Sequence, residues 1–105
     1  MRSYTRVAGA TDREMVRDYE WTNNADDCLR RWGLKPFDVE EAVRLGHGSR
    51  RRNRPGSSNP GREADWITRW PHPGGHGTIV VAYDWPARDG QDEARARLVS
   101  CWVVR

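Results

Sequence analysis

The sequence has few of the residues that make disulfides, metal centres or membrane spans. Its 105 residues contain two cysteines, Cys28 and Cys101, which form no Cys-x-x-Cys pair and no zinc-ligand spacing. We expect both thiols to be small, buried and reduced, although the sequence alone leaves a disulfide open. No apolar run is long enough for a transmembrane helix or a signal peptide, so we expect a soluble cytoplasmic protein.

Lysine is almost absent. Among 18 basic residues only Lys35 is a lysine, and the rest are arginines, whose planar guanidinium groups bind phosphate bidentately and stack on bases. A GC-rich coding sequence would produce the same bias without a functional cause, so both explanations stay open. The net charge of +3 bears on partners and solubility rather than on the fold.

Hydrophobic residues make up only 36% of the chain, but six Trp and three Tyr provide large side chains for a core, which disordered chains lack. The length predicts a single domain over residues 1–105. Residues 1–13 form a polar N-terminal extension. Residues 46–61 contain no aliphatic side chain, which predicts a flexible Arg-rich loop.

Hydrophobic periodicity predicts an α+β domain. The expected elements are a strand over 15–21, helices over 23–32 and 36–46, and strands over 62–70, 78–85 and 94–104. Thr22 suits a helix N-cap, Gly33 suits a helix stop, and Pro36 suits the first turn of the second helix. We therefore expect one strand, a two-helix hairpin and a three-stranded antiparallel meander, with the helices packed on one face of the sheet.

The alternation of the strands assigns side chains to the two faces of this sheet. The face under the helices should carry Trp66, Trp70, Leu98 and Trp102. The other, open face should carry Glu63, Asp65, Arg69, Arg95 and Arg97. Carboxylates and guanidinium groups on one rigid surface are what metal-free RNA cleavage needs, with a base for the ribose 2′-OH and arginines for the phosphate charge. Ordinary cross-strand ion pairing would give the same pattern.

The Arg-rich loop is a second candidate site. Arg50, Arg51, Arg52 and Arg54 place four cations within five residues, which is typical of sequence-independent phosphate binding. The alternatives are a solvated charge run and a docking site for an acidic protein.

The histidines and the strand-end tryptophans are weaker candidates. His47, His72 and His76 lie in Gly-rich segments without metal-ligand spacing, so we expect no metal site. His47 or His72 would serve as a general acid or base, unless each is an exposed bystander. Trp70 and Trp85 are candidates for stacking on bases.

Several blocks of the sequence resemble the BrnT family of bacterial type II toxins. That family opens with an aromatic-Glu-Trp-Asp strand, a helix ending in Lys-His-Gly, and a Phe-led acidic helix with Glu-Glu-Ala. The similar blocks in this chain are 19–22, 31–34 and 37–42, and three later strands are similar over 62–67, 79–83 and 97–100. The resemblance covers residues 19–102 and extends to a broader RelE-like group.

The chain departs from the family pattern at three places. Trp32 stands where the family has His, and Thr22 replaces an Asp. After Ser100 the family continues with Ala-Arg, and this chain continues with Cys101 and Trp102, so a basic residue is missing.

The resemblance implies a RelE-like fold, RNA endonuclease activity without metal or other cofactor, and neutralisation by a small antitoxin that folds onto the toxin. It implies catalytic roles for Arg62, Glu63 and Arg97, and the shared sheet face adds Arg69. In this hypothesis Glu63 is the base and the arginines hold the phosphate. The alternative is a non-catalytic nucleic-acid or protein-binding module on the same fold.

Overall fold

The computed structural model describes residues 16–54, 64–87 and 92–105. Its elements are β2 (Asp18–Trp21), α2 (Asn23–Trp32), α3 (Pro36–Gly46), the 3₁₀ helix η1 (His47–Ser49), β3 (Arg51–Arg52), β4 (Trp66–Pro71), β5 (Thr78–Asp84) and β6 (Arg95–Val104). The expected N-terminal extension, residues 1–13, lies outside the described residues. None of the described helices is long and apolar enough to span a bilayer.

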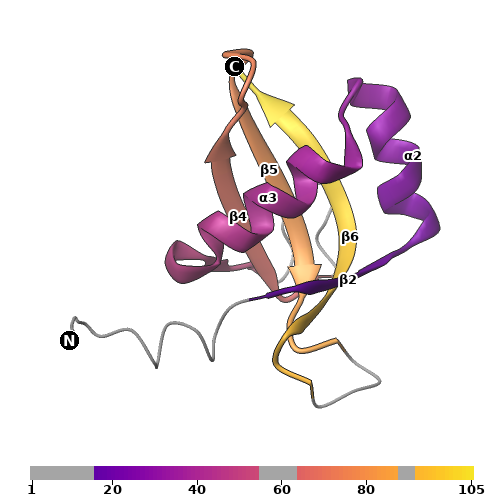
Figure 1. Ribbon diagram of the computed structural model, residues 1–105, viewed down its shortest axis with the longest axis vertical. Coiled ribbons are helices and arrows are strands. Elements are labelled where there is room, and N and C mark those ends of the chain that lie inside the picture. Colours follow the sequence, from indigo (N-terminus) through magenta and orange to yellow (C-terminus); the bar gives the residue numbers. More distant parts are fainter. Residues whose placement is uncertain (1–15, 55–63, 88–91) are drawn as a thin grey trace.

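One five-stranded sheet with the order β2-β6-β5-β4-β3 organises the fold (Figure 1). β4, β5 and β6 form the antiparallel meander that the sequence predicts. The expected arrangement is incomplete, because β3 adds an edge strand beside β4 and β2 pairs in parallel with β6 at the other edge. The α+β class with two helices is confirmed, and the sheet is larger and mixed.

Local signals set the ends of both helices. Thr22 caps α2, because its Oγ1 accepts a hydrogen bond from the Ala25 N–H at 3.1 Å. Gly33 ends α2 at a φ of 65°, a conformation that strains residues with a side chain. Pro36 lies in the first turn of α3, where backbone N–H groups have no acceptor within the helix, so proline loses no hydrogen bond there. These three residues define the helical hairpin that the sequence predicts.

α3 covers one face of the sheet across β4 and β5 (Figure 1). Its side chains Val39, Ala42 and Val43 are fully buried in the core, and each buried aliphatic side chain of valine size stabilises the fold by about 1.5–3 kcal/mol. Gly46 permits the close approach of α3 to β4, because a Cβ there would lie 3.2 Å from the Thr68 Cβ. The opposite face of the sheet is not covered by α3, and we call it the open face, although Val80, Ala82, Asp84 and Ser100 on it are fully buried.

The strand register places polar and charged residues together on the open face. In register order across the sheet, this face carries Asp18 and Glu20 of β2, Arg95, Arg97, Ser100 and Trp102 of β6, Thr78, Val80, Ala82 and Asp84 of β5, Ile67 and Arg69 of β4, and Arg51 of β3. The expectation that Arg69, Arg95 and Arg97 share one face is confirmed.

β6 contains a bulge at Val99. Tyr83 of β5 pairs with Leu98, whereas the preceding Ala82 pairs with Ser100, so Val99 is an extra residue on β6. Because side chains in a strand alternate, one extra residue reverses the faces of everything that follows it.

The bulge overturns one expected face assignment. Trp66, Trp70 and Leu98 pack with the core under α3, as expected. Cys101 also lies in the core, and Trp102 therefore lies on the open face. The expectation that Trp102 shares the helix-covered face is wrong, because strict alternation along β6 stops at the bulge.

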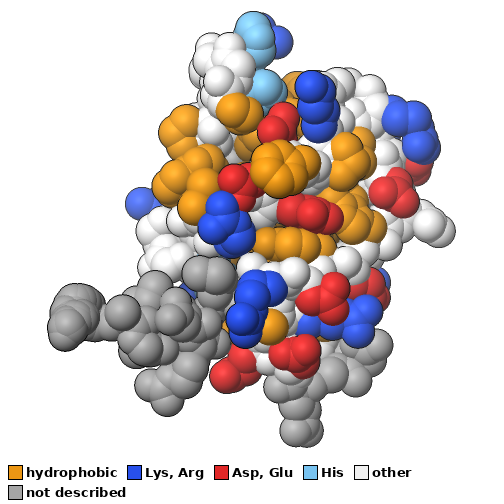
Figure 2. Space-filling model, viewed as in Figure 1, with side chains coloured by type: hydrophobic (Ala, Val, Ile, Leu, Met, Phe, Trp, Pro, Cys, Tyr) orange, Lys and Arg blue, Asp and Glu red, His pale blue; other side chains and the backbone are white. Residues whose placement is uncertain are grey.

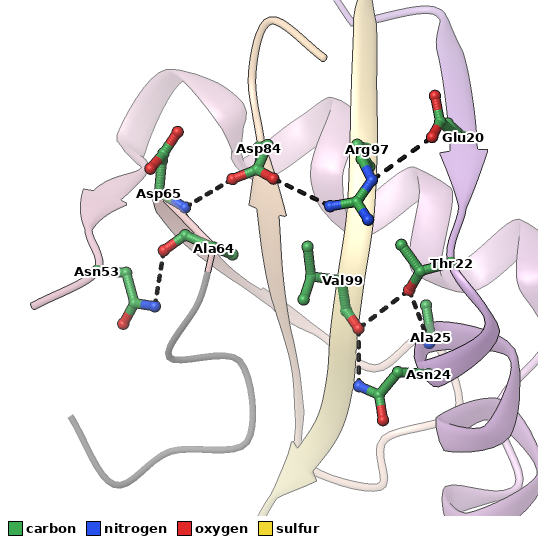
Figure 3. Close-up of polar contacts among 10 residues, drawn as sticks. All are labelled: Glu20, Thr22, Asn24, Ala25, Asn53, Ala64, Asp65, Asp84, Arg97 and Val99. Atoms are coloured by element: carbon green, nitrogen blue, oxygen red, sulfur yellow. Dashed lines mark hydrogen bonds and ion pairs between the residues drawn. The ribbon is translucent and has the colours of Figure 1, made fainter. Parts of the chain in front are cut away.

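The N-terminus of α2 holds the bulge in place. The Val99 carbonyl oxygen accepts hydrogen bonds from Asn24 Nδ2 at 2.8 Å and from Thr22 Oγ1 at 3.3 Å (Figure 3). The Thr22 N–H donates to the Leu98 carbonyl at 3.2 Å. The carbonyl that the register shift takes out of the β-ladder is thus satisfied by the helix.

The first part of the expected 46–61 loop is regular structure. Gly46 completes α3, residues 47–49 form η1 and residues 51–52 form β3. The prediction of a flexible loop is wrong for this part, because backbone pairing with β4 was not visible in the side-chain pattern. Residues 55–61 lie outside the described residues.

Removing the bonds to the Val99 carbonyl should destabilise the fold. We expect Asn24→Ala to lower the free energy of unfolding by about 1 kcal/mol. Thr22→Val, which also removes the cap of α2, should lower it by about 1–2 kcal/mol. The control is Asn23→Ala, whose exposed side chain makes neither bond. Urea denaturation measures all three, and equal losses for Asn23→Ala and Asn24→Ala would contradict the anchoring role.

Candidate functional site

An ion-pair row crosses three neighbouring strands on the open face (Figure 3). Arg97 of β6 lies between Glu20 of β2 and Asp84 of β5, its register partners on the two sides. Its Nε lies 3.5 Å from Glu20 Oε2 and its Nη1 lies 3.4 Å from Asp84 Oδ2. Nη2, the third nitrogen, enters neither of these two ion pairs. The guanidinium group is therefore oriented by two carboxylates and keeps a donor for a further partner.

Asp84 is fully buried, although it lies on the open face. A buried carboxylate is costly unless charges and hydrogen bonds compensate it. Arg97 supplies a cation, and the Asp65 N–H donates to Asp84 Oδ1 at 3.0 Å. Because Asp84 is buried, water screens its interaction with Arg97 less than it screens an ion pair between two exposed side chains.

The chain just before β4 is anchored to this row. Asn53, which is buried, donates from Nδ2 to the Ala64 carbonyl at 2.9 Å, and its N–H donates to the Asp65 carbonyl at 2.9 Å. Ala64 and Asp65 are thereby held beside Asp84 (Figure 3). Arg62 and Glu63, which the resemblance indicates as catalytic, lie outside the described residues.

Arg95 extends the row towards the solvent. It lies 3.6 Å from Asp18 Oδ2 and 3.6 Å from Glu20 Oε1, so Glu20 faces two arginines. The Arg95 side chain is 41% exposed and the Asp18 side chain 64% exposed. Exposed pairs of this kind contribute little to stability, and their main effect here is on the local potential.

Arg69 lies on the same face but away from the row. It pairs with Val80, which is four residues before Asp84 on β5. Four residues of strand span about 13 Å. Arg69 and Arg97 therefore share the open face without sharing one site, and a single bound phosphate would not contact both.

The Arg50–Arg54 run is divided between two roles. Arg50 stacks on the rings of Trp66 and Trp85, with its Cζ at 4.5 Å and 4.6 Å from the ring centroids, and Arg52 lies 4.8 Å from the Trp66 ring. These cation–π contacts pin the edge strand β3 to the sheet. Arg51 and Arg54 are exposed.

The tryptophans expected to stack on bases are already engaged. Trp85 contacts the Arg50 guanidinium and the His47 ring, and Trp70 packs against the core. Their placement near strand ends predicts accessible rings, but Trp70 packs against the core at one end of the sheet and Trp85 contacts Arg50 and His47 at the other.

His47 is buried, with 3% of its surface exposed. Its Nδ1 lies 2.7 Å from the Tyr83 hydroxyl, and its ring meets the Trp85 ring edge-on at 4.5 Å. Burial, together with the Arg50 charge, lowers the pKa of His47 to about 4. Burial also raises the pKa of Tyr83. His47 is thus a neutral structural residue rather than a solvent-facing acid or base.

His72 is partly buried and its Nδ1 accepts a hydrogen bond from the Gly74 N–H at 2.9 Å, whereas His76 is exposed. His72 and His76 meet edge-on at 5.4 Å in the β4–β5 turn. Within the described ranges, no three His, Cys, Asp or Glu side chains come together as they would around a metal ion. Cys28 and Cys101 are buried free thiols, and burial raises the pKa of Cys101 to about 12, which makes it unreactive.

Three residues of the open face were given no role by the sequence reasoning. The sequence predicts Glu20 only as part of a strand motif, because nothing in the side-chain pattern predicts the parallel pairing of β2 with β6. Asp84 is fully buried, which the polarity of its side chain does not predict. Trp102 was placed on the wrong face, and no sequence signal marks the bulge. Comparisons with family models, curated proteins and solved structures gave no match.

The buried His47 should make stability depend on pH. Its pKa is about 4 in the folded state, against an ordinary value of 6.5, so only the unfolded chain takes up this proton between those values. Its contribution is complete above pH 6.5 and is lost as the pH falls towards 4, by as much as about 3 kcal/mol.

His47→Gln removes this contribution, so its free energy of unfolding should fall less between pH 6.5 and pH 4 than that of the wild type. Urea denaturation across this range measures the difference, with the exposed His76→Gln as control. Parallel losses in the wild type and His47→Gln would show that His47 is already accessible to protons.

Proposed function

We propose that this chain is a metal-independent RNA endonuclease of the bacterial toxin kind, with its active site at Arg97 on the open face. The observation that supports this most is the fixed position of the Arg97 guanidinium between Glu20 and Asp84. Arg97 is one of the residues that the family resemblance indicates. A RelE-like fold is part of the proposal, and helices on one sheet face with charged residues on the other are consistent with it.

The proposed chemistry uses the ribose 2′-OH as nucleophile. A carboxylate base takes the 2′-OH proton, O2′ bonds to phosphorus, the bond from phosphorus to O5′ breaks, and the departing O5′ takes a proton from water. The products are a 2′,3′-cyclic phosphate and a 5′-OH. Negative charge grows on the phosphate oxygens in the transition state, and a donor already oriented towards them stabilises it without reorganisation. Arg97 Nη2 would be that donor.

The base in this proposal is Glu63, which the sequence places directly before Ala64. Ala64 is held beside the Asp84–Arg97 pair through Asn53 and Asp65. Asp84 itself is a poor candidate for the base, because its two oxygens already accept from Asp65 and pair with Arg97. Its role would be to position Arg97.

The proposed antitoxin partner would cover the helical side of the molecule. Hydrophobic side chains gather among charged ones on that side (Figure 2). Trp32, Phe37 and Leu45, from α2 and α3, are 44%, 68% and 41% exposed. Large exposed apolar side chains on neighbouring helices are typical of a protein-binding surface.

Replacing Arg97 with lysine tests the active site with little risk to the fold, because the positive charge beside Asp84 is kept. We expect RNA cleavage to fall by about 10²–10³-fold, since lysine lacks the rigid fork of donors. Growth and total RNA integrity are followed after induced expression in a bacterial host. The matched control is Arg30→Lys, on the exposed surface of α2.

Glu63→Gln tests the base in the same assay. The account expects growth arrest with RNA decay for the wild type and Arg30→Lys, and neither for Arg97→Lys and Glu63→Gln. Unchanged cleavage by Glu63→Gln would remove that residue as the base. Normal growth and intact RNA with the wild type would remove the nuclease function.

The second candidate function is nucleic-acid binding without cleavage. It is favoured by the two exposed arginines Arg51 and Arg54 at the β3 edge, which face no carboxylate in any ion pair of the described residues. Charge reversal of Arg50 or Arg52 would disturb their stacking on tryptophan, so the informative substitutions are at the exposed positions.

Arg51→Glu/Arg54→Glu should abolish RNA binding under the second function and only weaken it under the first. Each lost phosphate contact should lower the slope of log affinity against log salt by about 0.7 for single strands. Filter binding at several salt concentrations measures this, with Arg30→Glu/Arg31→Glu on α2 as control. Equal effects of both double variants would show that only net charge matters.

A further inference from the structure

Trp102 differs from most tryptophans of this chain. Trp21, Trp66, Trp70 and Trp85 all pack against the hydrophobic core. Trp102 does not belong to that core, because the bulge at Val99 turns its side chain onto the open face. It is partly exposed there, in the second half of a central strand.

The strand register sets Trp102 in line with Arg69. Val80 of β5 pairs with Trp102 on one side and with Arg69 on the other, so the three residues form one row across the sheet. Val80 is fully buried, so this row is accessible only at its two ends. Two strand spacings separate Trp102 from Arg69, or about 10 Å.

Arg51 adds a second cation to the arginine end of this row. It pairs with Ile67, two residues before Arg69 on the same face. Diagonal neighbours of an antiparallel pair lie about 7–8 Å apart. Both arginines are exposed, and among the described residues neither belongs to an ion pair. Their charges are therefore not balanced by a carboxylate of the described residues, whereas Arg97 pairs with two.

The carboxylates of the open face lie towards the other end of the strands. Asp84, the nearest one on β5, is four residues from Val80, or about 13 Å along the strand. This exceeds the Debye length at physiological salt, so those carboxylates repel a phosphate near Arg69 only weakly. The open face thus has a paired, nearly neutral end and an aromatic, cationic end.

We infer that Trp102, Arg69 and Arg51 form a binding platform for single-stranded RNA, with a base stacked on the Trp102 ring and phosphates on the two arginines. A partly exposed aromatic ring beside exposed cations on a rigid sheet suits the binding of unpaired bases without sequence preference. The choice of RNA as the ligand rests on the proposed function. The platform would hold the strand on one side of Arg97, where cleavage is proposed.

The test compares two apolar replacements of Trp102. Trp102→Phe keeps an aromatic face, and Trp102→Leu keeps an apolar side chain without one. Affinity is measured by fluorescence anisotropy with a labelled, short 2′-O-methyl oligouridine, single-stranded or annealed to its complement. Thermal melting confirms that each variant is folded, and Trp32→Leu, on exposed α2, is the matched control.

We expect Trp102→Leu to bind the single strand roughly 10-fold more weakly than the wild type, and Trp102→Phe to bind it nearly as well. Binding of the duplex should be unchanged, because paired bases cannot stack on the ring. Arg69→Gln should lower the salt slope by about 0.7, and Arg30→Gln should not. Three results would each overturn the platform. Trp102→Leu could bind the single strand with wild-type affinity, or both Trp102 variants could lose the same affinity for it. Trp102→Leu could also lose the same affinity for the duplex as for the single strand.

The readout separates this inference from the proposed function. A 2′-O-methyl strand cannot be cleaved by 2′-OH attack, so binding is measured whether or not the chain is a nuclease. The expected binding pattern without cleavage of ordinary RNA would remove the nuclease and leave the platform. Cleavage that depends on Arg97, with wild-type binding by Trp102→Leu, would remove the platform and leave the nuclease.

Discussion

The hydrogen bonds to the Val99 carbonyl are the interaction on which the open face depends. The bulge lets β6 present Arg97 before Val99 and Trp102 after it on the same side of the sheet, which strict alternation forbids. A bulge leaves a carbonyl outside the ladder, and the loss of both donors to the partly buried Val99 carbonyl would destabilise the fold by about 1 kcal/mol. Thr22 and Asn24, at the start of α2, supply the missing donors. The start of α2 therefore stabilises the bulge that places Trp102 on the same face as Arg97.

The two ends of the open face follow different electrostatic rules. At one end Arg97 is held by Glu20 and the buried Asp84, so its charge is largely balanced and its orientation is fixed. At the other end Arg69 is exposed and belongs to no ion pair of the described residues. Fixed orientation suits stabilisation of a transition state, and free charge suits the capture of a polyanion. A strand bound along the face would meet both.

The sequence predicts those parts of the fold that local physics determines. Thr22, Gly33 and Pro36 act through their own backbone preferences, so the helix boundaries were predictable. The β4–β6 meander was predictable because short connections favour antiparallel neighbours. The parallel pairing of β2 and the addition of β3 depend on backbone hydrogen bonds between distant segments, which leave no trace in the side-chain pattern.

The residues of the candidate site were likewise predictable only where local periodicity determines their position. Arg97 and Arg69 lie on the expected face because strand periodicity determines it before the bulge and throughout β4. Trp102 could not be placed, since one inserted residue reverses the face and Val99 itself carries no bulge signature. The Arg50–Arg54 run looked uniform, but two of its members stack on tryptophans that lie far away in the sequence. Tertiary contacts of this kind decide which charges remain available.

The most direct test of the account is an NMR titration of the ¹⁵N-labelled protein with a 2′-O-methyl RNA strand. We expect the largest shifts on the backbone amides around Trp102, Arg69 and Arg97 and on the Trp102 indole N–H. The amides of α3 should not move, because that helix lies on the other face of the sheet. Shifts confined to α2 and α3, around Phe37, would contradict the claim that the open face is the nucleic-acid site.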